Sequence, residues 1–185
     1  MIEFDDTFYE LERDINSYME EKYKKQGKRS LWNWAVNVPL LETRFHKLVT
    51  SSDKMINYIN KGSFDKRSVL DLGCGFCQYW PFLEMYGFND FVGVDLFSLR
   101  GQGSQEYMKT AEDFSSVFCQ KSVTKIYEAD VRNIDSFLTS NKRFELIFTK
   151  NTNYKKLGST GIPKEIFDVV VENRLSPNGI AIYAG

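Results

Sequence analysis

The chain has 185 residues, of which 42% are hydrophobic and 26% charged, as in a single globular domain with a buried core. The formal net charge is -1 and the isoelectric point lies near 5.9, so we expect no nonspecific binding to nucleic acid or to anionic membranes. No apolar run approaches the ~20 residues that span a bilayer, and the acidic N-terminus is unlike a signal peptide. Three cysteines without framework spacing indicate a reducing compartment, so we expect a cytoplasmic protein. From the charge and the lack of a long apolar run, we expect no nucleic-acid partner and no membrane partner.

The first 62 residues are expected to be helical. Apolar residues recur at steps of three and four between residues 5 and 25, where Thr7 and Glu10 have the spacing of a capping box. Further helices are predicted at 31–36, 40–48 and 52–59, with Pro39 and Gly62 as breaks. We therefore divide the chain into a helical extension, residues 1–62, and a second unit, residues 63–185. The extension is expected to act as a lid that supplies substrate contacts.

Strands and helices are expected to alternate through the second unit. Strands are predicted at 69–72, 91–94, 125–128, 144–149 and 180–183, and helices at 79–86, 105–119, 134–138 and 164–175. Short apolar strands separated by helices predict a parallel sheet with helices on both faces. The run Ser176-Pro177-Asn178-Gly179 is predicted to be a turn that leads into the last strand.

A glycine turn follows the first predicted strand, in Asp71-Leu72-Gly73-Cys74-Gly75, and the second strand ends on an acid, Asp95. A strand, a tight glycine turn and a helix let the backbone approach a ligand closely. A dinucleotide fingerprint would place a third glycine where Gln78 stands, and Asp71 would repel a pyrophosphate. A cationic ligand has the opposite preference, and S-adenosyl-L-methionine carries an amine and a sulfonium but no phosphate.

Five segments, in order, resemble the motifs of the class I S-adenosylmethionine-dependent methyltransferases. They are residues 71–75, 93–95, 128–131, 144–151 and 175–180, and the likeness covers about residues 65–185. The resemblance implies an α/β fold, a Rossmann-like three-layer sandwich with a mostly parallel sheet, preceded by the all-helical N-terminal extension. It also implies S-adenosyl-L-methionine as the cofactor.

The resemblance further implies how the cofactor would bind. Gly73 and Gly75 would let the main chain pass against the methionine part. Asp95 would accept two hydrogen bonds from the ribose hydroxyls, and Asp130, with the amide that follows it, would bind the adenine edge. The cofactor-binding residues expected on this basis are Asp71, Gly73, Cys74, Gly75, Asp95, Leu96, Asp130, Val131 and Asn151.

The expected reaction is transfer of the sulfonium methyl group to an oxygen or nitrogen of a small-molecule acceptor. The run from Asn151 to Tyr154 lacks the prolines of the DNA enzymes that methylate amino groups, which argues against base methylation. The catalytic base is unassigned, and the candidates are Tyr154, Lys150 and His46, although His46 suits a surface or structural role better. Cys74 and Cys77 have no second cysteine pair, so no metal site is expected.

Two alternatives and one structural question stay open. The chain could bind S-adenosyl-L-methionine without transferring its methyl group and be completed by a partner chain, or it could use the cofactor for other chemistry, such as cleavage. The family's sheet normally has seven strands, whereas the strands predicted here end with the fifth. The fold is then a minimal version with an exposed edge, a truncated version, or one whose edge is covered by the N-terminal helices or by a partner such as a second copy.

Overall fold

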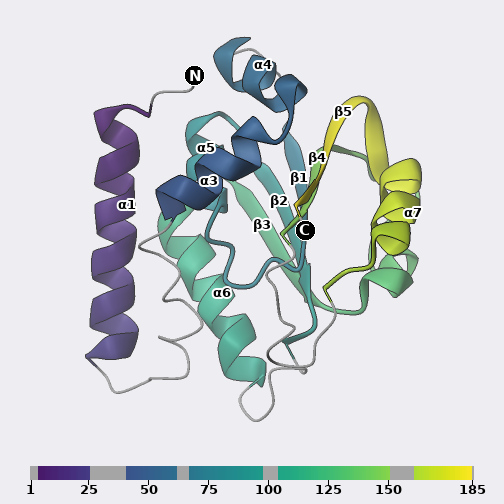
Figure 1. The fold of residues 1–185 in the computed structure, drawn as a ribbon. Helices are drawn as coiled ribbons and strands as arrows, with labels where there is room; N and C mark the ends of the chain where they lie inside the picture. Colours follow the sequence, from purple (N-terminus) through teal and green to yellow (C-terminus); the bar gives the residue numbers. More distant parts are fainter. Residues whose placement is uncertain (1–3, 26–40, 62–66, 98–103, 151–160, 185) are drawn as a thin grey trace.

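The structure is a computed structural model that describes residues 4–25, 41–61, 67–97, 104–150 and 161–184. Within these residues, five strands form one sheet in the order β3-β2-β1-β4-β5, and every neighbouring pair is parallel (Figure 1). The strands are β1 (Ser68–Leu72), β2 (Asp90–Asp95), β3 (Val123–Glu128), β4 (Phe144–Lys150) and β5 (Leu175–Ala184). The predicted α/β fold with a parallel sheet is therefore confirmed.

Helices cover the sheet on both sides, which makes three layers (Figure 1). Between the strands lie α5 (Trp80–Met85), α6 (Ser104–Phe118), the short 3-10 helix η4 (Val131–Ser136) and α7 (Lys164–Arg174). Alternate strand residues point to opposite faces, as the two-residue period of a strand requires. Val69 and Phe91 pack into the core beneath the N-terminal helices, α5 and α6, whereas Leu70 and Val92 pack into the core beneath η4 and α7.

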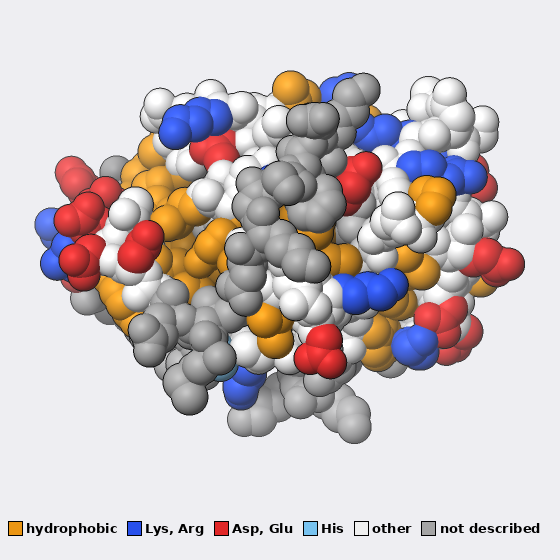
Figure 2. Space-filling model, turned by 90° about the horizontal axis from the view of Figure 1, so that it is seen from above, with side chains coloured by type: hydrophobic (Ala, Val, Ile, Leu, Met, Phe, Trp, Pro, Cys, Tyr) orange, Lys and Arg blue, Asp and Glu red, His pale blue; other side chains and the backbone are white. Residues whose placement is uncertain are grey.

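The N-terminal helices α1 (Asp6–Met19), α3 (Leu41–Thr50) and α4 (Asp53–Lys61) share a core with the sheet. Phe8 of α1 and Phe45 of α3 both contact Phe82 of α5, with ring centroids 4.4 and 5.3 Å apart. Seen from above the view of Figure 1, hydrophobic side chains gather between α1, at the left edge, and the middle of the molecule (Figure 2). The division at residue 62 stays a prediction, and the described parts on its two sides are joined by one continuous core.

The N-terminal end of α1 differs in detail from the prediction. The cap is Asp5, whose carboxylate accepts a hydrogen bond from the amide of Phe8 at 3.1 Å, so the proposed capping role of Thr7 is wrong. A carboxylate is as good an acceptor here as a threonine hydroxyl, and it also favours the positive end of the helix dipole. After Met19 the chain continues as a π-helix, η1 (Glu20–Lys24). The helix predicted at 31–36 lies outside the described residues.

The run from Ser176 to Gly179 does not form a separate turn before the last strand. It belongs to β5, which starts directly after α7, and the pairing with β4 shifts register between Phe144 and Leu146. The turn-forming residues thus produce an irregularity within the strand, as a bulge does. The carboxylate of Glu145 lies next to this irregularity and accepts hydrogen bonds from the Ser68 amide at 2.9 Å and the Ser176 hydroxyl at 3.3 Å.

At the outer edge of β5, no further strand pairs with it among the described residues. A partner that covers this edge stays a prediction, which the mass of the chain in size-exclusion chromatography with light scattering would test. No helix in the described ranges is long and apolar enough to cross a membrane.

Candidate cofactor site

The sheet order reverses between β1 and β4, which are neighbours although the chain visits β2 and β3 between them. Chain segments that leave the carboxyl ends of such strands go to opposite sides and open a crevice, where ligands bind in open α/β sheets. The turn after β1 starts at Gly73, which lies on this edge and is exposed. Among the described residues, a Cβ atom on Gly73 would meet only Ile162 Cδ1, at 3.9 Å, so none of them crowds the turn on this side.

The glycine turn is held against the end of β2 by its own amides. Gly73 and Gly75 have φ angles of +78° and +57°, a region that glycine enters without steric cost. The Gly73 amide donates to the carbonyl oxygen of Val94 at 2.7 Å. The Gly75 amide donates to Asp95 Oδ2 at 2.8 Å. The first predicted motif and the acid of the second, twenty residues apart in sequence, therefore meet directly.

Asp95 is half-buried at the carboxyl end of β2. Its contact with Gly75 orients the carboxylate toward the turn, where a bound ligand would pass. Leu96 follows it and is also half-buried, while Cys74 is buried beneath the turn. A carboxylate next to an open glycine turn can accept charge-assisted hydrogen bonds from a diol.

Asp71 is buried in β1, directly before the turn. Its side chain is 2% exposed, and its Oδ2 accepts a hydrogen bond from the indole nitrogen of Trp80 at 2.9 Å. Sequence reasoning missed Trp80, because the pairing of Asp71 with Gly93 across β1 and β2, which leaves room for the indole ring, is visible only in the sheet.

Asp130 caps the 3-10 helix η4, and its carboxylate accepts hydrogen bonds from the backbone amide of Arg132 at 2.9 Å and from Arg132 Nε at 3.0 and 2.9 Å. These hydrogen bonds hold the pKa of the Asp130 carboxyl below its ordinary value. Val131, which follows, is buried in the core beneath η4. Arg132 was not among the predicted residues, although a cation two positions from a capping acid could have indicated the pair.

Of the three candidate bases, His46 is the one whose side chain lies within the described part of the chain. His46 lies on α3, with its ring centroid 6.0 Å from that of Phe4, within the helical layer. Lys150 is the last residue of β4, which places its backbone at the carboxyl edge of the sheet. Asn151 and Tyr154 lie outside the described residues, so their predicted roles stay predictions.

All three cysteines are buried. Burial raises the pKa of the Cys77 thiol well above its ordinary value, and the neighbouring Cys74 and Asp71 add to this effect. A thiol with a raised pKa is protonated at neutral pH and is a poor nucleophile. No group of three or more His, Cys, Asp or Glu side chains within the described ranges could hold a metal ion.

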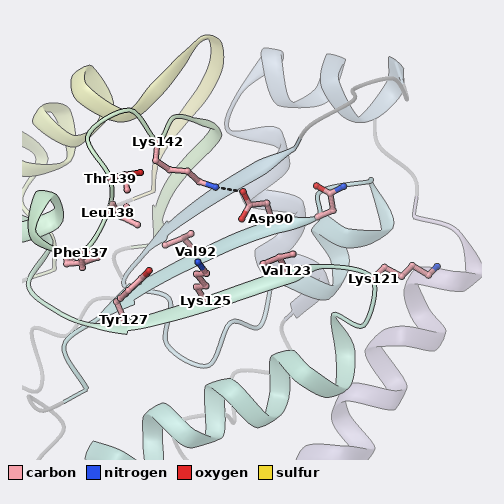
Figure 3. Close-up of a pocket in the computed structure, with 11 residues that line it drawn as sticks. Asp90, Val92, Lys121, Val123, Lys125, Tyr127, Phe137, Leu138, Thr139 and Lys142 are labelled. Carbon is pink, nitrogen blue, oxygen red and sulfur yellow. Dashed lines mark hydrogen bonds and ion pairs between the residues drawn. The ribbon is translucent and has the colours of Figure 1, made fainter.

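An open groove of about 600 Å³ lies away from the glycine turn, on the face of β2 and β3 next to η4 (Figure 3). Its lining includes Val92 of β2, Lys125 and Tyr127 of β3, and Lys142, which pairs with Asp90. The groove exists because η4 is too short to cover this part of the sheet. It contains none of the predicted site residues, so the glycine turn and not this groove is the candidate cofactor site.

The described residues at the turn suit a cationic ligand that carries a ribose and no phosphate. The carboxylates of Asp71 and Asp95 lie beneath and beside the turn, and a negative charge there would oppose a phosphate. The turn amides of Gly73 and Gly75, which a phosphate would need as donors, are already bonded to β2.

No protein-family model matches the chain, and no curated protein matches it. Solved structures do. The plantazolicin methyltransferase BpumL, in complex with a pentazolic desmethylPZN analog and SAH, is 20% identical with a TM-score of 0.51, covering 97% of this chain and 61% of its own. A protein from Methanococcus maripaludis, assigned as an S-adenosyl-L-methionine-dependent methyltransferase, is 15% identical with a TM-score of 0.50, covering 80% of this chain and 60% of its own.

A third structure, an S-adenosylmethionine-dependent methyltransferase from Clostridium acetobutylicum, is 21% identical with a TM-score of 0.48, covering 82% of this chain. The chain spans 56% of the length of that structure and about 60% of the other two. At these identities the likeness concerns the fold. The two structures with TM-scores of 0.50 and 0.51 show that the chain has the fold of class I S-adenosylmethionine-dependent methyltransferases, as the sequence motifs predicted.

Proposed function

We propose that the chain is an S-adenosyl-L-methionine-dependent methyltransferase that transfers a methyl group to an oxygen or nitrogen of a small-molecule acceptor. The observation that carries the proposal is the hydrogen bond from the Gly75 amide to Asp95, which joins the glycine turn to the acid at the end of β2. The shared fold and the order of the five motifs support it.

Each part of the cofactor has a matching group in the chain. The turn at Gly73 and Gly75 would hold the methionine part, and the Asp95 carboxylate would accept hydrogen bonds from the ribose hydroxyls. The Asp130 region would hold the adenine. Because the carboxylate of Asp130 is already bonded to Arg132, either Arg132 turns away or the amides next to Asp130 do more of the binding.

The cofactor supplies an activated methyl group on a sulfonium, so the chain has to provide alignment more than chemical activation. The preformed turn and Asp95 would fix the reacting end over the carboxyl edges of β1 and β4, and proximity of the acceptor would supply most of the rate increase. The residue that accepts a proton from the acceptor is unassigned, with Lys150 and Tyr154 as the candidates that follow or end β4.

Isothermal titration calorimetry with S-adenosyl-L-homocysteine tests the site. Asp95→Ala removes a charged acceptor whose hydrogen bonds are worth about 1.5–3 kcal/mol each, so we expect the affinity to fall at least tenfold. Asp14→Ala, which removes an exposed acid on α1, is the matched control and should leave the affinity unchanged. Unchanged binding by the Asp95 variant would contradict the site, and absence of binding to the wild type would contradict the cofactor.

Transfer of labelled methyl from S-adenosyl-L-methionine to small molecules of a cell extract tests the reaction. Label in a small-molecule product supports the proposal. Binding without transfer would favour a cofactor-binding protein completed by a partner chain, and breakdown of the cofactor without a methylated product would favour cleavage chemistry. Label in protein or nucleic acid would contradict the small-molecule acceptor.

A further inference from the structure

Trp80 joins the helix that follows the glycine turn to the acid that precedes it. It is the first residue of α5, its side chain is fully buried, and its ring stacks on Phe91 of β2 with centroids 5.2 Å apart and planes 16° apart. The indole N–H donates to Asp71 Oδ2 at 2.9 Å. A buried indole N–H needs an acceptor, and here that acceptor is the acid of the glycine motif.

The space for the indole ring comes from Gly93, the residue that pairs with Asp71 across the parallel strands. A Cβ atom on Gly93 would lie 2.9 Å from Trp80 Cζ2 and 2.7 Å from Cys74 Sγ, closer than real Cβ contacts. Gly93 therefore lets the indole ring and the buried side chain of the turn approach each other over β2. Trp80 thus contacts both Asp71, the acid of the motif, and Phe91 of β2, the strand against which the glycine turn is held.

Asp71 is 2% exposed, and a buried carboxylate is costly unless donors satisfy it. The indole N–H is one such donor, and it restricts the rotamers that the carboxylate can adopt. The charge of Asp71 lies directly beneath a turn that we assign to the cationic part of the cofactor. The direction in which this carboxylate points therefore affects both the shape and the potential of the turn.

We propose that Trp80 is a positioning residue for the cofactor: its indole N–H orients the Asp71 carboxylate, and its ring supports the glycine turn through Cys74 and Gly93. This inference rests on the proposed function, because it concerns how the same site is prepared. It adds a residue that lies outside every motif of the resemblance.

The test measures S-adenosyl-L-homocysteine binding by calorimetry in the full chain, with Trp80→Phe, Asp71→Asn and Phe91→Leu as variants. Trp80→Phe keeps an aromatic ring but removes the N–H, and we expect the affinity to fall about tenfold, as for loss of a hydrogen bond to a charged group. Phe91→Leu disturbs the packing of the same ring but keeps the N–H, and it should change the affinity less than threefold.

The pH dependence separates positioning from packing. Loss of a donor disfavours the carboxylate form of Asp71, so its pKa rises. In Trp80→Phe, the weakening of binding on acidification should then start at higher pH than in the wild type. In Asp71→Asn, which cannot titrate, this contribution should be absent. A purely structural role would lower the melting temperature without moving this pH profile.

The outcomes are distinct. If the wild type binds and Trp80→Phe binds equally well with an unshifted pH profile, Trp80 is not a positioning residue and the proposed function stands. If the wild type does not bind, the proposed function fails, and this inference fails with it. If Trp80→Phe does not fold, NMR of the Trp80 indole nitrogen replaces it as the test. The indole resonance must shift when S-adenosyl-L-homocysteine is added to the wild type and stay unchanged in Asp71→Asn.

Discussion

The two faces of the sheet are covered by different numbers of helices, and the glycine turn packs against the face that has more of them. One face is covered by α1, α3, α4, α5 and α6 with a dense set of stacked and tilted rings. The other is covered by the short η4 and by α7, and an open groove lies over β2 and β3 (Figures 1 and 3). Trp80 and Asp71 belong to the first face, so the turn is packed against the ring-rich half of the core.

The difference follows from the lengths of the connections. The chain between β2 and β3 holds α6, with 15 residues, whereas the chain between β3 and β4 holds η4, with six. A six-residue helix cannot cover two strands, so β3 keeps an exposed side chain, Val123, toward the groove. If packing sets the contribution of each face to stability, substitutions in the ring-rich face should cost more free energy of unfolding than substitutions in the other face.

The largest effect is expected at Phe45 of α3. Its ring is fully buried and lies within 6.5 Å of the rings of Phe8, Phe82, Tyr79 and Tyr86. Phe45→Ala leaves a cavity in this cluster and should lower the free energy of unfolding by about 3–5 kcal/mol. Urea unfolding measures it, and a loss below ~1 kcal/mol would show that the N-terminal helices contribute little to the fold.

On the other face, Arg174 is the key polar residue. Its side chain is 1% exposed and donates to Asp135 and to the carbonyl oxygens of Thr139 and Leu138, which ties the end of α7 to the turn after η4. Arg174→Met keeps much of the volume but removes these bonds, so we expect a loss of about 1–3 kcal/mol in urea unfolding. Arg174→Lys should recover part of it. A loss as large as that of Phe45→Ala would contradict the expectation that this face contributes less to stability than the face covered by the N-terminal helices.

A smaller, pH-dependent effect is expected at Lys22, which ties η1 to α6. Its ammonium donates to Asp113 at 3.0 Å and to the Tyr18 hydroxyl at 2.7 Å. Burial acts to raise the pKa of Asp113, but the hydrogen bonds from Lys22 and Lys109 outweigh it, and that pKa is lowered. The stabilisation is thus present above the ordinary pKa of an aspartate, ~3.9, and is lost as the pH falls through the lowered value.

Lys22→Met should therefore cost about 1 kcal/mol or less at pH 7 and almost nothing at an acidic pH at which carboxyl NMR shows Asp113 to be protonated. Urea unfolding at both pH values checks the difference, and carboxyl NMR should show the pKa of Asp113 rising toward its ordinary value. Lys109→Met, which removes a more exposed partner of the same acid, is the control and should have a smaller effect. Equal losses at the two pH values would contradict the assigned role.

The smallest effect is expected at Val123, which is 60% exposed above the groove. Val123→Ser should change the unfolding free energy by less than about 0.5 kcal/mol. Val92→Ala, in the same groove but 2% exposed, is the matched comparison and should cost about 1.5 kcal/mol or more. Similar losses at the two positions would mean that the groove is closed in solution.

The sequence by itself determined the order of strands and helices, the glycine turn after β1 and the acid at the end of β2. These features are local: apolar runs of strand length, glycines that permit positive φ and an acid at a strand end can each be recognised within a few residues. The bond between Gly75 and Asp95 could be anticipated because the carboxyl ends of adjacent parallel strands meet at one edge.

Only the tertiary structure decided which groups surround these features. The contact of Trp80 with Asp71 depends on the register that sets Gly93 beside Asp71, and no periodicity in one chain segment reveals the register between two strands. The engagement of Asp130 by Arg132, the absorption of residues 176–179 into β5 and the open groove likewise depend on what packs against each element. These contacts join elements that are far apart in the sequence, so they form only when the whole chain folds and cannot be inferred from any one segment.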